Sequence, residues 1–404
     1  MGRVAEPEGR GRVGAALRKS AAFSMSDSAH PRGGGSERKY KTEPIFHAFV
    51  AKSPYPPNMI AAILTAVLLS SSQPAMSASP AKPIIIAHRG ASGERPEHTR
   101  AAYALAVDQG ADFIEPDLVM TRDGHLVVRH ENEIGETTDV ADRPEFATRR
   151  TTRNVDGVPI TGWFTEDFTL AELQTLRARE RLPALRPASA AFDGQEPILT
   201  FDEVVAIARE GAARTGRVIG VAPELKHPSH FAALNLPMED IFVAALERHG
   251  LTAADAPILI QCFEVGTLER LKARIDAPLL QLMQAGGGPA DRPDLTYAEM
   301  ATPQGLTEIA RYADAVGVQD LMVVPRDDTG RALGASSLTT DAHTAGLKVV
   351  VWTFRAENLF LPAQYRVGDA PADHGDLTGW LKAIYALGVD AVFSDFPAAA
   401  VKAR

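Results

Sequence analysis

Short apolar runs alternate with amphipathic stretches along the chain from residue 84 to the C-terminus. The apolar runs have the length of buried strands, and the amphipathic stretches have the spacing of helices that cover a sheet. This rhythm is typical of repeated βα units around a parallel sheet. Nine strands are predicted, at residues 84–87, 112–118, 126–129, 218–224, 257–262, 278–283, 314–318, 347–353 and 389–394.

One of the nine strands does not belong to the βα rhythm. The tight turn Asp123-Gly124 lies between the second and third strands, so these two form an antiparallel hairpin. Removing the hairpin partner leaves the eight strands of a barrel, and we predict an α/β protein with a TIM (β/α)8 barrel. Helices are predicted at residues 97–109, 200–211, 238–249, 265–273, 303–312, 337–345, 376–387 and 397–402.

Two segments interrupt the alternation of strands and helices. Residues 131–197 form an insertion after the β-hairpin that follows strand 2, and they contain one clear helix, near residues 170–178. Residues 355–375 form a second, shorter insertion. Because both follow strands, both are expected to rise from the C-terminal face, where barrels of this kind build their active sites. We interpret them as candidate lids, with surface elaboration as the alternative for the second.

The N-terminal part differs from the rest of the chain. Residues 1–58 mix Gly, Ser, Pro and Arg without hydrophobic period, which predicts disorder. From Met59 an apolar stretch of about 10 residues is followed by small residues, which predicts a signal peptide at residues 59–79. Residues 1–58 would then be an upstream extension of the reading frame or a long n-region, and a short buried helix is the alternative to the signal peptide. Residues 80–404 are predicted to form one TIM-barrel domain of a periplasmic or secreted protein, without stable membrane insertion after cleavage.

Charge and cysteine content exclude several classes of partner and chemistry. The net charge is −9, but residues 1–58 carry 10 Lys and Arg against 5 Asp and Glu, which leaves 32 against 46 in the rest. Such an acidic body repels nucleic acid, so no nucleic-acid partner is expected. The single cysteine, Cys262, cannot form an intrachain disulfide, and its apolar context indicates a buried side chain. The sequence gives no basis for an oligomeric state.

Carboxylates end two neighbouring strands of the predicted barrel. Glu115 and Asp117 are two residues apart, so the period of a strand points both to the same side. Glu224 and Lys226 repeat this spacing on the next strand and bring a third carboxylate and an ammonium group to the same mouth. Three acidic side chains without a cysteine or histidine cluster suit a hard divalent cation, calcium or magnesium, rather than zinc.

Two histidines accompany these carboxylates. His88 and Arg89 follow the first strand, and His130 closes the hairpin strand. A metal ion together with Arg89 and Lys226 could neutralise a phosphodiester, while one imidazole activates the nucleophile and the other protonates the leaving alkoxide. The combination predicts phosphoryl chemistry at neutral pH.

The order of these motifs resembles that of a known family. The motifs are His-Arg-Gly at 88–90, Pro-Glu-His-Thr at 96–99, Gly-Ala-Asp-Phe-Ile-Glu-Pro-Asp at 110–117, Thr-Arg-Asp-Gly at 121–124, His-Glu at 130–131 and Glu-Leu-Lys at 224–226. Together they resemble the glycerophosphodiester phosphodiesterase family, particularly its secreted, calcium-dependent periplasmic branch. The resemblance covers residues 84–404, including 261–263, 352–354 and 394–397.

The resemblance implies a TIM barrel that hydrolyses glycerophosphodiesters, such as glycerophosphocholine or glycerophosphoethanolamine, to an alcohol and sn-glycerol 3-phosphate. The small-molecule substrate would be the partner of the site, and the cofactor would be calcium, with magnesium as the alternative. By the family's motifs, the acid/base pair would be His88 and His130; the metal ligands Glu115, Asp117 and Glu224; the phosphate-binding residues Arg89 and Lys226; and the lining of the glycerol or leaving-group pocket Phe263 and Trp352.

Two positions depart from the commonest form of the family's motifs. His98 stands where the family often has Asn, and Glu131 stands where it often has Asp. His98 is expected to add a third imidazole near the mouth. The remaining histidines have no supporting constellation and are interpreted as surface or loop residues, among them His125, His227, His230, His249, His343 and His374.

Two other functions remain open at this point. A phospholipase-type phosphodiesterase on the same barrel would need an apolar rim to reach a bilayer, whereas residues 131–197 are polar and charged. A catalytically inactive phosphodiester-binding surface protein would have no need for both histidines and all three carboxylates, which the chain retains.

Overall fold

The computed structural model describes residues 82–404, and all nine predicted strands are present in this part of the chain. Two of them are divided at Pro116 and Pro223, because proline has no N–H to donate to a neighbouring strand. In chain order the strands of the main sheet are β1 (Ile84–His88), β2 (Phe113–Glu115), β3 (Asp117–Met120), β4 (Leu126–Val128), β7 (Gly220–Val221), β8 (Glu224–Leu225), β9 (Ile260–Cys262), β10 (Leu279–Met283), β11 (Ala315–Gln319), β12 (Lys348–Phe354) and β13 (Ala391–Ser394).

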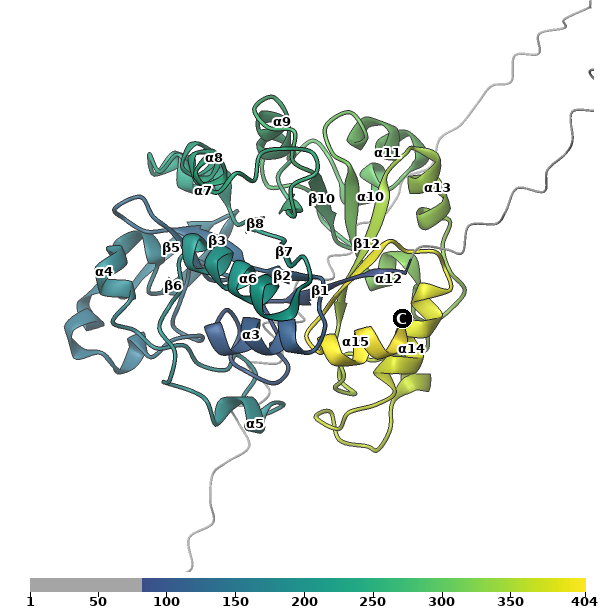
Figure 1. The fold of residues 1–404 in the computed structure, drawn as a ribbon, viewed down its shortest axis with the longest axis horizontal. Coiled ribbons are helices and arrows are strands. Elements are labelled where there is room, and N and C mark those ends of the chain that lie inside the picture. Colours follow the sequence, from purple (N-terminus) through teal and green to yellow (C-terminus); the bar gives the residue numbers. More distant parts are fainter. Residues whose placement is uncertain (1–81) are drawn as a thin grey trace, which may run out of the picture. The chain divides into compact units, whose positions relative to one another are not determined.

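The main sheet closes into a barrel. Strand β1 pairs in parallel with β2 on one side and with β13 on the other. From β3 the parallel pairing continues through β8, β9, β10, β11 and β12 to β13, so the strands run once around the axis (Figure 1). Strand β4 pairs with β3 in the antiparallel direction, as the Asp-Gly turn predicts. The predicted TIM barrel is therefore the observed fold.

Helices surround the barrel, and all eight predicted ones are present. Helix α6 shows why the sequence sets their limits: the Thr200 hydroxyl caps its first turn in a capping box with Glu203, and Gly216 ends it with a φ of 69°. The eight helices are α3 (Arg100–Asp108), α6 (Phe201–Thr215), α8 (Met238–His249), α9 (Val265–Lys272), α11 (Pro303–Ile309), α13 (Leu338–Thr344), α14 (Leu377–Tyr385) and α15 (Pro397–Ala403). Shorter helices follow some of the strands: α7 (Pro228–Ala233), α10 (Tyr297–Met300) and α12 (Asp320–Val323).

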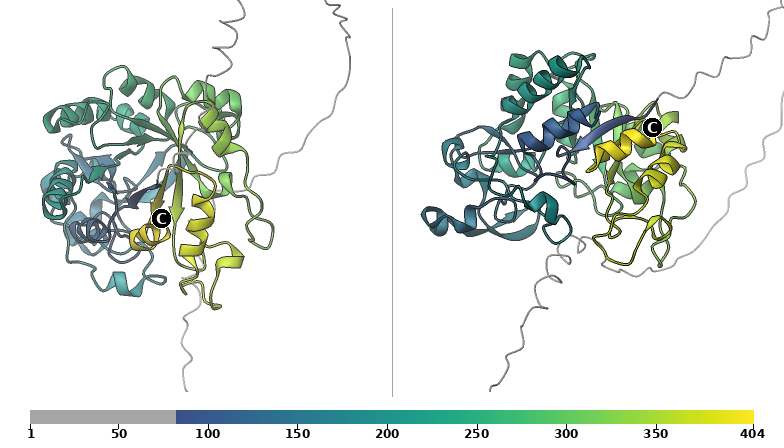
Figure 2. Two further views of the ribbon diagram at one scale, coloured as in Figure 1. Left: turned by 45° about the vertical axis from the view of Figure 1, so that its right-hand side comes forward. Right: turned by 60° about the horizontal axis from the view of Figure 1, so that its bottom comes forward.

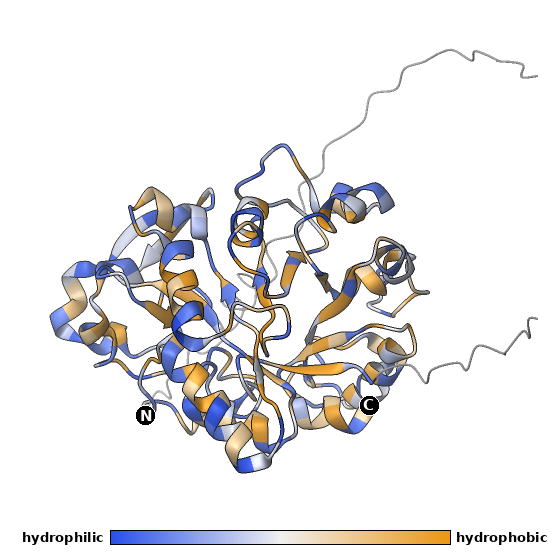
Figure 3. Cartoon of the chain, turned by 45° about the horizontal axis from the view of Figure 1, so that its top comes forward, coloured by the Kyte–Doolittle hydropathy of each residue, from blue (hydrophilic) through white to orange (hydrophobic). Residues whose placement is uncertain are grey.

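The hydrophobic core has two layers. A large outer layer packs the helices against the outside of the sheet. A smaller cluster fills the barrel interior below the mouth, and it consists of Ile86, Ala222, Leu280, Leu282, Ala315, Val350, Ala391 and Phe393. Apolar colour accordingly dominates the strands, whereas the helices show polar residues on their outer sides (Figure 3). The interior is thus packed with apolar side chains, and buried polar side chains gather at its C-terminal end.

The insertion, residues 131–197, contains more regular structure than its composition predicts. It forms a β-hairpin of β5 (Thr151–Val155) and β6 (Val158–Gly162) beside the barrel (Figure 2). The predicted helix near residues 170–178 is wrong in its length, because α4 ends after one turn (Leu170–Leu173). The remaining elements are the 3-10 turns at Val140–Asp142, Pro144–Arg149 and Thr165–Asp167 and the short helix α5 (Pro187–Ala190).

The predictions for the N-terminal part, disorder at 1–58 and a signal peptide at 59–79, lie outside the described residues. Within residues 82–404, no helix combines the length and the apolar character that crossing a membrane requires.

Candidate active site in the barrel mouth

The turn after β1 brings the backbone of Arg89 into the mouth of the barrel. Arg89 and Gly90 both have left-handed backbone angles, with φ of 59° and 85°. A Cβ on Gly90 would lie 2.7 Å from the backbone carbon of Ala102 in α3, so only glycine allows this close approach. As a result, the backbone N–H of Arg89 donates to Glu115 Oε2 at 2.7 Å.

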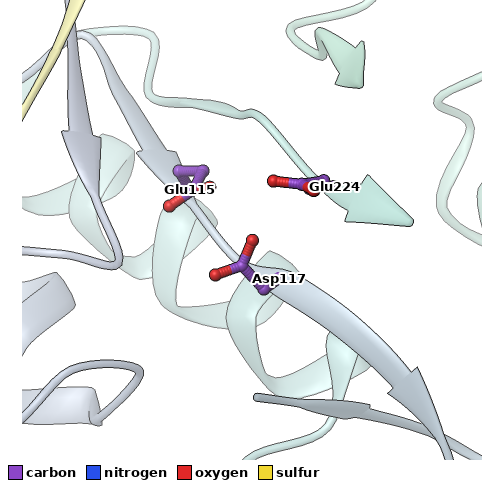
Figure 4. Close-up of side chains that lie close together, drawn as sticks. All are labelled: Glu115, Asp117 and Glu224. Atoms are coloured by element: carbon purple, nitrogen blue, oxygen red, sulfur yellow. The ribbon is translucent and has the colours of Figure 1, made fainter. Parts of the chain in front are cut away.

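Three carboxylates from neighbouring strands meet in this mouth. Glu115 ends β2, Asp117 begins β3, and Glu224 begins β8, where it is the register partner of Asp117. All three side chains are buried, and they point toward one another (Figure 4). One oxygen from each lies within 4.8 Å of the others. Sequence spacing alone predicted this juxtaposition.

Neighbouring polar groups fix the orientation of these carboxylates. Gln261 of β9 donates to Glu115 Oε1 at 3.3 Å. His98 Nε2 lies 2.9 Å from Asp117 Oδ2, and its Nδ1 lies 2.9 Å from the Tyr103 hydroxyl. Both nitrogens of His98 are therefore engaged, and its side chain is fully buried. His98 thus adds a third imidazole near the mouth, as expected, and it orients Asp117.

Neighbouring cations compensate only part of the negative charge of these three carboxylates. Lys226 Nζ lies 2.6 Å from Glu224 Oε1 and 3.4 Å from Asp117 Oδ1, and Arg89 Nε lies 3.2 Å from Asp117 Oδ2. Burial and the charge of Asp117 raise the pKa of Glu115 well above its usual value. Burial also raises the pKa of Glu224 to about 8, although Lys226 opposes the shift. Burial acts in the same direction on Asp117, but Lys226, His130 and Arg89 hold its pKa well below the usual value.

These carboxylates have the properties of a site for a hard divalent cation. Asp117 Oδ1 and Glu224 Oε1 belong to buried side chains, and Lys226 Nζ is the cation that lies beside both. The donor set consists of oxygen atoms alone, which suits calcium or magnesium. An added positive charge would also relieve the repulsion that raises the pKa of Glu115 and Glu224. The residues present therefore fit such an ion.

His88 ends β1 beside Glu115, its register partner on β2. Its Nδ1 lies 2.6 Å from Asp395 Oδ1, just past the end of β13. Burial and Arg89 lower the pKa of His88 to about 4, although Asp395 opposes the shift. Burial alone would raise the pKa of Asp395, but Arg355 and Arg186 hold this pKa well below its usual value.

His130 follows β4, the antiparallel partner of β3. The backbone N–H of Arg129 donates to the Asp117 carbonyl at 3.0 Å, which places His130 close to Asp117. His130 Nδ1 lies 2.5 Å from Glu131 Oε1. Burial and Arg89 lower the pKa of His130 below its usual value, although Glu131 opposes them. Each histidine thus faces a carboxylate through Nδ1.

Phe263 and Trp352 form an aromatic wall at the mouth. Their ring centroids are 6.0 Å apart at 85°, and Lys226 Nζ lies 5.9 Å from the Phe263 centroid. Both side chains are half-buried and rest on the cluster inside the barrel. Together with the residues above, all nine site residues predicted from the sequence lie at this end of the barrel.

The structure assigns partners that the sequence analysis missed. Asp395 contacts His88, and Gln261 contacts Glu115. Both residues belong to motifs that carry the family resemblance, but the sequence analysis assigned neither of them a role. Arg181 and Arg186 of the insertion also reach this end of the barrel, and no local sequence signal marks them. The interpretation of His230 was wrong: it is not an isolated surface residue, because its Nε2 lies 2.9 Å from the buried Glu166.

Comparison with known proteins identifies the family. The model of the glycerophosphoryl diester phosphodiesterase family matches residues 88–399. The chain belongs to this family. A glycerophosphodiester phosphodiesterase of Arabidopsis thaliana is 36% identical over 327 residues, which cover 78% of this chain and 84% of the relative. One of Haemophilus influenzae is 28% identical over 366 residues, which cover 84% and 94%.

A solved structure supports the same fold. The phosphodiesterase of Oleispira antarctica, in complex with its product sn-glycerol-3-phosphate, has a TM-score of 0.52 at 21% identity. The match covers 80% of this chain and 96% of that one. The family, the barrel fold and the classification as a phosphodiesterase, all predicted from the sequence motifs, are confirmed.

Proposed function

We propose that this glycerophosphodiester phosphodiesterase is calcium-dependent and cleaves small soluble diesters to an alcohol and sn-glycerol 3-phosphate. The observation that carries the proposal is the buried group of Glu115, Asp117 and Glu224, beside which lie two histidines with Nδ1 already engaged. The curated relatives named for this activity match over most of their own length.

The cations of the mouth bind the phosphate. Lys226 and Arg89 are both buried and carry positive charge next to the carboxylates. A divalent cation held by Glu115, Asp117 and Glu224 would add Lewis-acid polarisation of a phosphoryl oxygen. Oxygen-only ligation on buried carboxylates favours calcium, and magnesium is the competing ion. The aromatic wall of Phe263 and Trp352 then packs against the apolar part of the substrate.

His88 and His130 act as the acid/base pair. Because Nδ1 of each lies on a carboxylate, Nε2 is the nitrogen left for the substrate. Both pKa values are lowered, so each imidazole can take a proton from a nucleophile near neutral pH. The anionic phosphate raises the pKa of the imidazole that binds next to it, which lets one histidine carry the proton that the leaving alkoxide needs.

Variants that lose metal binding and variants that lose proton transfer should behave differently, and this difference tests the roles proposed for the carboxylates and the histidines. We expect purified protein treated with chelator to lose release of glycerol 3-phosphate from glycerophosphocholine, and calcium to restore it better than magnesium. Glu115→Gln, Asp117→Asn and Glu224→Gln should require more calcium, with partial recovery at high concentration. His88→Ala and His130→Ala should lose about 100- to 10,000-fold in kcat without recovery, since the metal site is retained.

The outcomes separate the alternatives. Calcium rescue of the histidine variants would overturn the acid/base roles. Absence of turnover on every diester, with calcium still bound, would identify an inactive phosphodiester-binding protein. Faster turnover of phospholipid vesicles than of glycerophosphocholine would identify a phospholipase.

We also propose that the protein is exported, to the periplasm or beyond. The apolar run from residue 60 to 69 and the small residues after it support a signal peptide, which would place the mature N-terminus between about 75 and 82. N-terminal sequencing of exported protein tests this. Recovery of intact residues 1–58 on cytoplasmic protein would contradict it.

A further inference from the structure

Two arginines of the insertion lie behind the two histidines. Arg181 and Arg186 are five residues apart in the segment that precedes α5. Arg186 binds Asp395, the carboxylate on His88 Nδ1, and Arg181 binds Glu131, the carboxylate on His130 Nδ1. One short segment therefore reaches the carboxylate partners of both histidines.

Arg186 is buried and uses three of its nitrogens on three different acceptors. Its Nη2 donates to Asp395 Oδ2 at 2.6 Å, its Nε to Glu357 Oε1 at 2.5 Å, and its Nη1 to the Ser92 carbonyl at 2.9 Å. The planar guanidinium thereby fixes Asp395 against both the β12 side and the β1 side of the mouth. Arg355 Nε shares Asp395 Oδ2 at 2.9 Å, so Asp395 keeps one cation when Arg186 is changed.

Arg181 bridges two carboxylates in the same way. It donates to Glu131 from Nη1 at 3.0 Å and from Nη2 at 2.7 Å. Its Nε and Nη2 also donate to Glu97 at 2.8 and 2.6 Å. Glu97 in turn accepts from Arg89, so the bridge continues to the proposed phosphate-binding residue.

The segment that carries these arginines is held in place by its own buried contacts. Glu180 accepts from the Ser189 hydroxyl at 2.5 Å and from the backbone of Leu182 at 2.8 Å. Glu180 and Ser189 are both buried. The two guanidinium groups are therefore presented from a fixed loop rather than from a free one.

We propose that Arg181 and Arg186, here called the arginine clamp, are positioning residues that hold both histidines in their reactive orientation through Glu131 and Asp395. The proposal rests on the proposed function, because it requires His88 and His130 to be the acid/base pair. It gives the insertion a direct part in turnover, which its position outside the barrel strands does not indicate. Neither arginine needs to touch the substrate, so loss of the clamp should lower kcat and leave KM unchanged.

Double-mutant cycles on the full chain test the clamp. The variants are Arg186→Lys and Asp395→Asn for one histidine, and Arg181→Lys and Glu131→Gln for the other. At position 186, lysine keeps the positive charge opposite the buried Glu357, but it cannot reproduce the three hydrogen bonds of the planar guanidinium. We expect each Arg→Lys variant to lose about 10- to 100-fold in kcat, as outer positioning partners do, with KM on glycerophosphocholine unchanged.

The coupling pattern distinguishes positioning from a general structural role. In an Asp395→Asn background, Arg186→Lys should cost no more than about twofold further, because its effect passes through Asp395. Arg181→Lys should behave the same in a Glu131→Gln background. In the crossed pair, Arg186→Lys with Glu131→Gln, the two losses in kcat should instead multiply, because the two residues act on different histidines.

An arginine of the same insertion provides the matched control. Arg179 pairs with the exposed Asp142 and contacts neither Asp395 nor Glu131, so Arg179→Lys should keep the wild-type kcat. Thermal melting should show that the Arg→Lys variants are folded at the assay temperature, and titration with calcium alone should give wild-type values for all of them. If Arg186→Lys does not fold at the assay temperature, the cycle is run on Arg186→Gln combined with Glu357→Gln, which removes both buried charges together.

The outcomes keep the two proposals apart. Wild-type turnover in His88→Ala or His130→Ala would refute the proposed function itself. Loss of turnover in those variants, together with wild-type kcat in both Arg→Lys variants, would overturn the clamp alone. Multiplicative losses in Arg186→Lys/Asp395→Asn, or a change confined to KM, would also overturn it.

Discussion

At the scale of single residues, the mouth pairs each histidine with a carboxylate and each carboxylate with an arginine. The His88–Asp395 and His130–Glu131 contacts fix which ring nitrogen faces the protein. A carboxylate accepts from Nδ1–H, so it selects the tautomer with a free Nε2 and would stabilise the imidazolium that the proposed proton transfer forms. The same carboxylates would otherwise be repelled by the acidic group at the metal position, and the arginines offset this repulsion.

The low pKa of His88 predicts a pH-dependent stability. In the folded protein burial and Arg89 lower this pKa to about 4, whereas an unfolded histidine titrates near 6.5. Between pH 6.5 and 4 the unfolded chain takes up a proton that the folded chain does not, so the contribution of His88 to the free energy of unfolding falls as pH falls. Relative to wild type, His88→Gln should become more stable by roughly 3 kcal/mol across this window. Urea titrations of both proteins with chelator measure it, and parallel stability curves would contradict it.

The leaving group reveals which histidine is the acid. Nitrophenolate departs without a proton because nitrophenol is acidic, whereas the alkoxide of choline needs a proton in order to leave. The alanine variant of the acid should therefore lose about 100- to 10,000-fold on glycerophosphocholine and far less on a nitrophenyl diester. The variant of the base should lose equally on both. Equal losses for His88→Ala and His130→Ala on both substrates would mean that neither is a dedicated acid.

Sequence reasoning found the residues that follow strand ends and missed those that reach the mouth from elsewhere. Glu115, Asp117 and Glu224 could be predicted because strand period and strand order alone bring them together. Arg181 and Arg186 could not, since their partners lie up to 209 positions away and the loop that presents them has no periodic pattern. The position of His98 near the mouth could be predicted, but its orienting role could not, because that role depends on contacts with Tyr103 and Asp117 that only the fold creates.

At the scale of elements, the turn between β1 and α3 joins packing to chemistry. Gly90 lets α3 approach the strand, and the preceding Arg89 amide binds Glu115. The left-handed backbone at Arg89 is thus maintained by the packing of α3, and it orients Glu115. Glycine is required here for two reasons, its positive φ and the absence of a Cβ.

Substitution of Gly90 should therefore affect both stability and activity. Gly90→Ala places a Cβ 2.7 Å from the Ala102 backbone at a φ of 85°, so we expect a loss of roughly 2–4 kcal/mol in the free energy of unfolding. Gly216→Ala, at the end of α6, has a φ of 69° and no atom within 4 Å, and should cost about 1 kcal/mol. Displacement of the Arg89 amide should also weaken calcium binding in Gly90→Ala alone. Chemical denaturation and calcium titration measure both effects, and equal behaviour of the two variants would refute the role of Gly90.

Elements with a strong periodic signal were predicted closely, and those of the insertion were not. Helix α8 has the predicted limits, 238–249, because its apolar stripe and Gly250 define both ends. The β5–β6 hairpin was missed although Asp156-Gly157 marks its turn, because its strands are mostly exposed and show no clear alternation. Helix α4 begins with a capping box of Thr169 and Glu172, yet it ends after one turn. A cap sets where a helix begins, and tertiary contacts set where it ends.

At the scale of the whole molecule, the insertion is attached to the mouth at several separate points. Besides the arginine clamp, Asp156 at the tip of the β5–β6 hairpin lies 2.5 Å from His227, the residue after Lys226. Glu166 contacts His230 of α7. These contacts come from the middle of the insertion and the arginine clamp from its later part, so the insertion is fixed to both the β1 side and the β8 side of the barrel. The surface it brings to the site is polar and charged.

A polar insertion fixed at the mouth predicts the physical form of the substrate. A bilayer lipid would have to reach the carboxylates past side chains such as Arg181 and Glu131, which give no apolar surface for acyl chains to bury. Water-soluble diesters enter without that cost. We therefore expect kcat/KM for glycerophosphocholine to exceed the value for phosphatidylcholine vesicles by more than about 1000-fold, a difference of roughly 4 kcal/mol in transition-state free energy.

The release of glycerol 3-phosphate from glycerophosphocholine and of phosphatidate from the vesicles measures this ratio. Short-chain phosphatidylcholine below its micelle concentration serves as control, since it separates exclusion of the bilayer from rejection of the acyl chains. Comparable rates on vesicles and on glycerophosphocholine would show that the insertion does not restrict access.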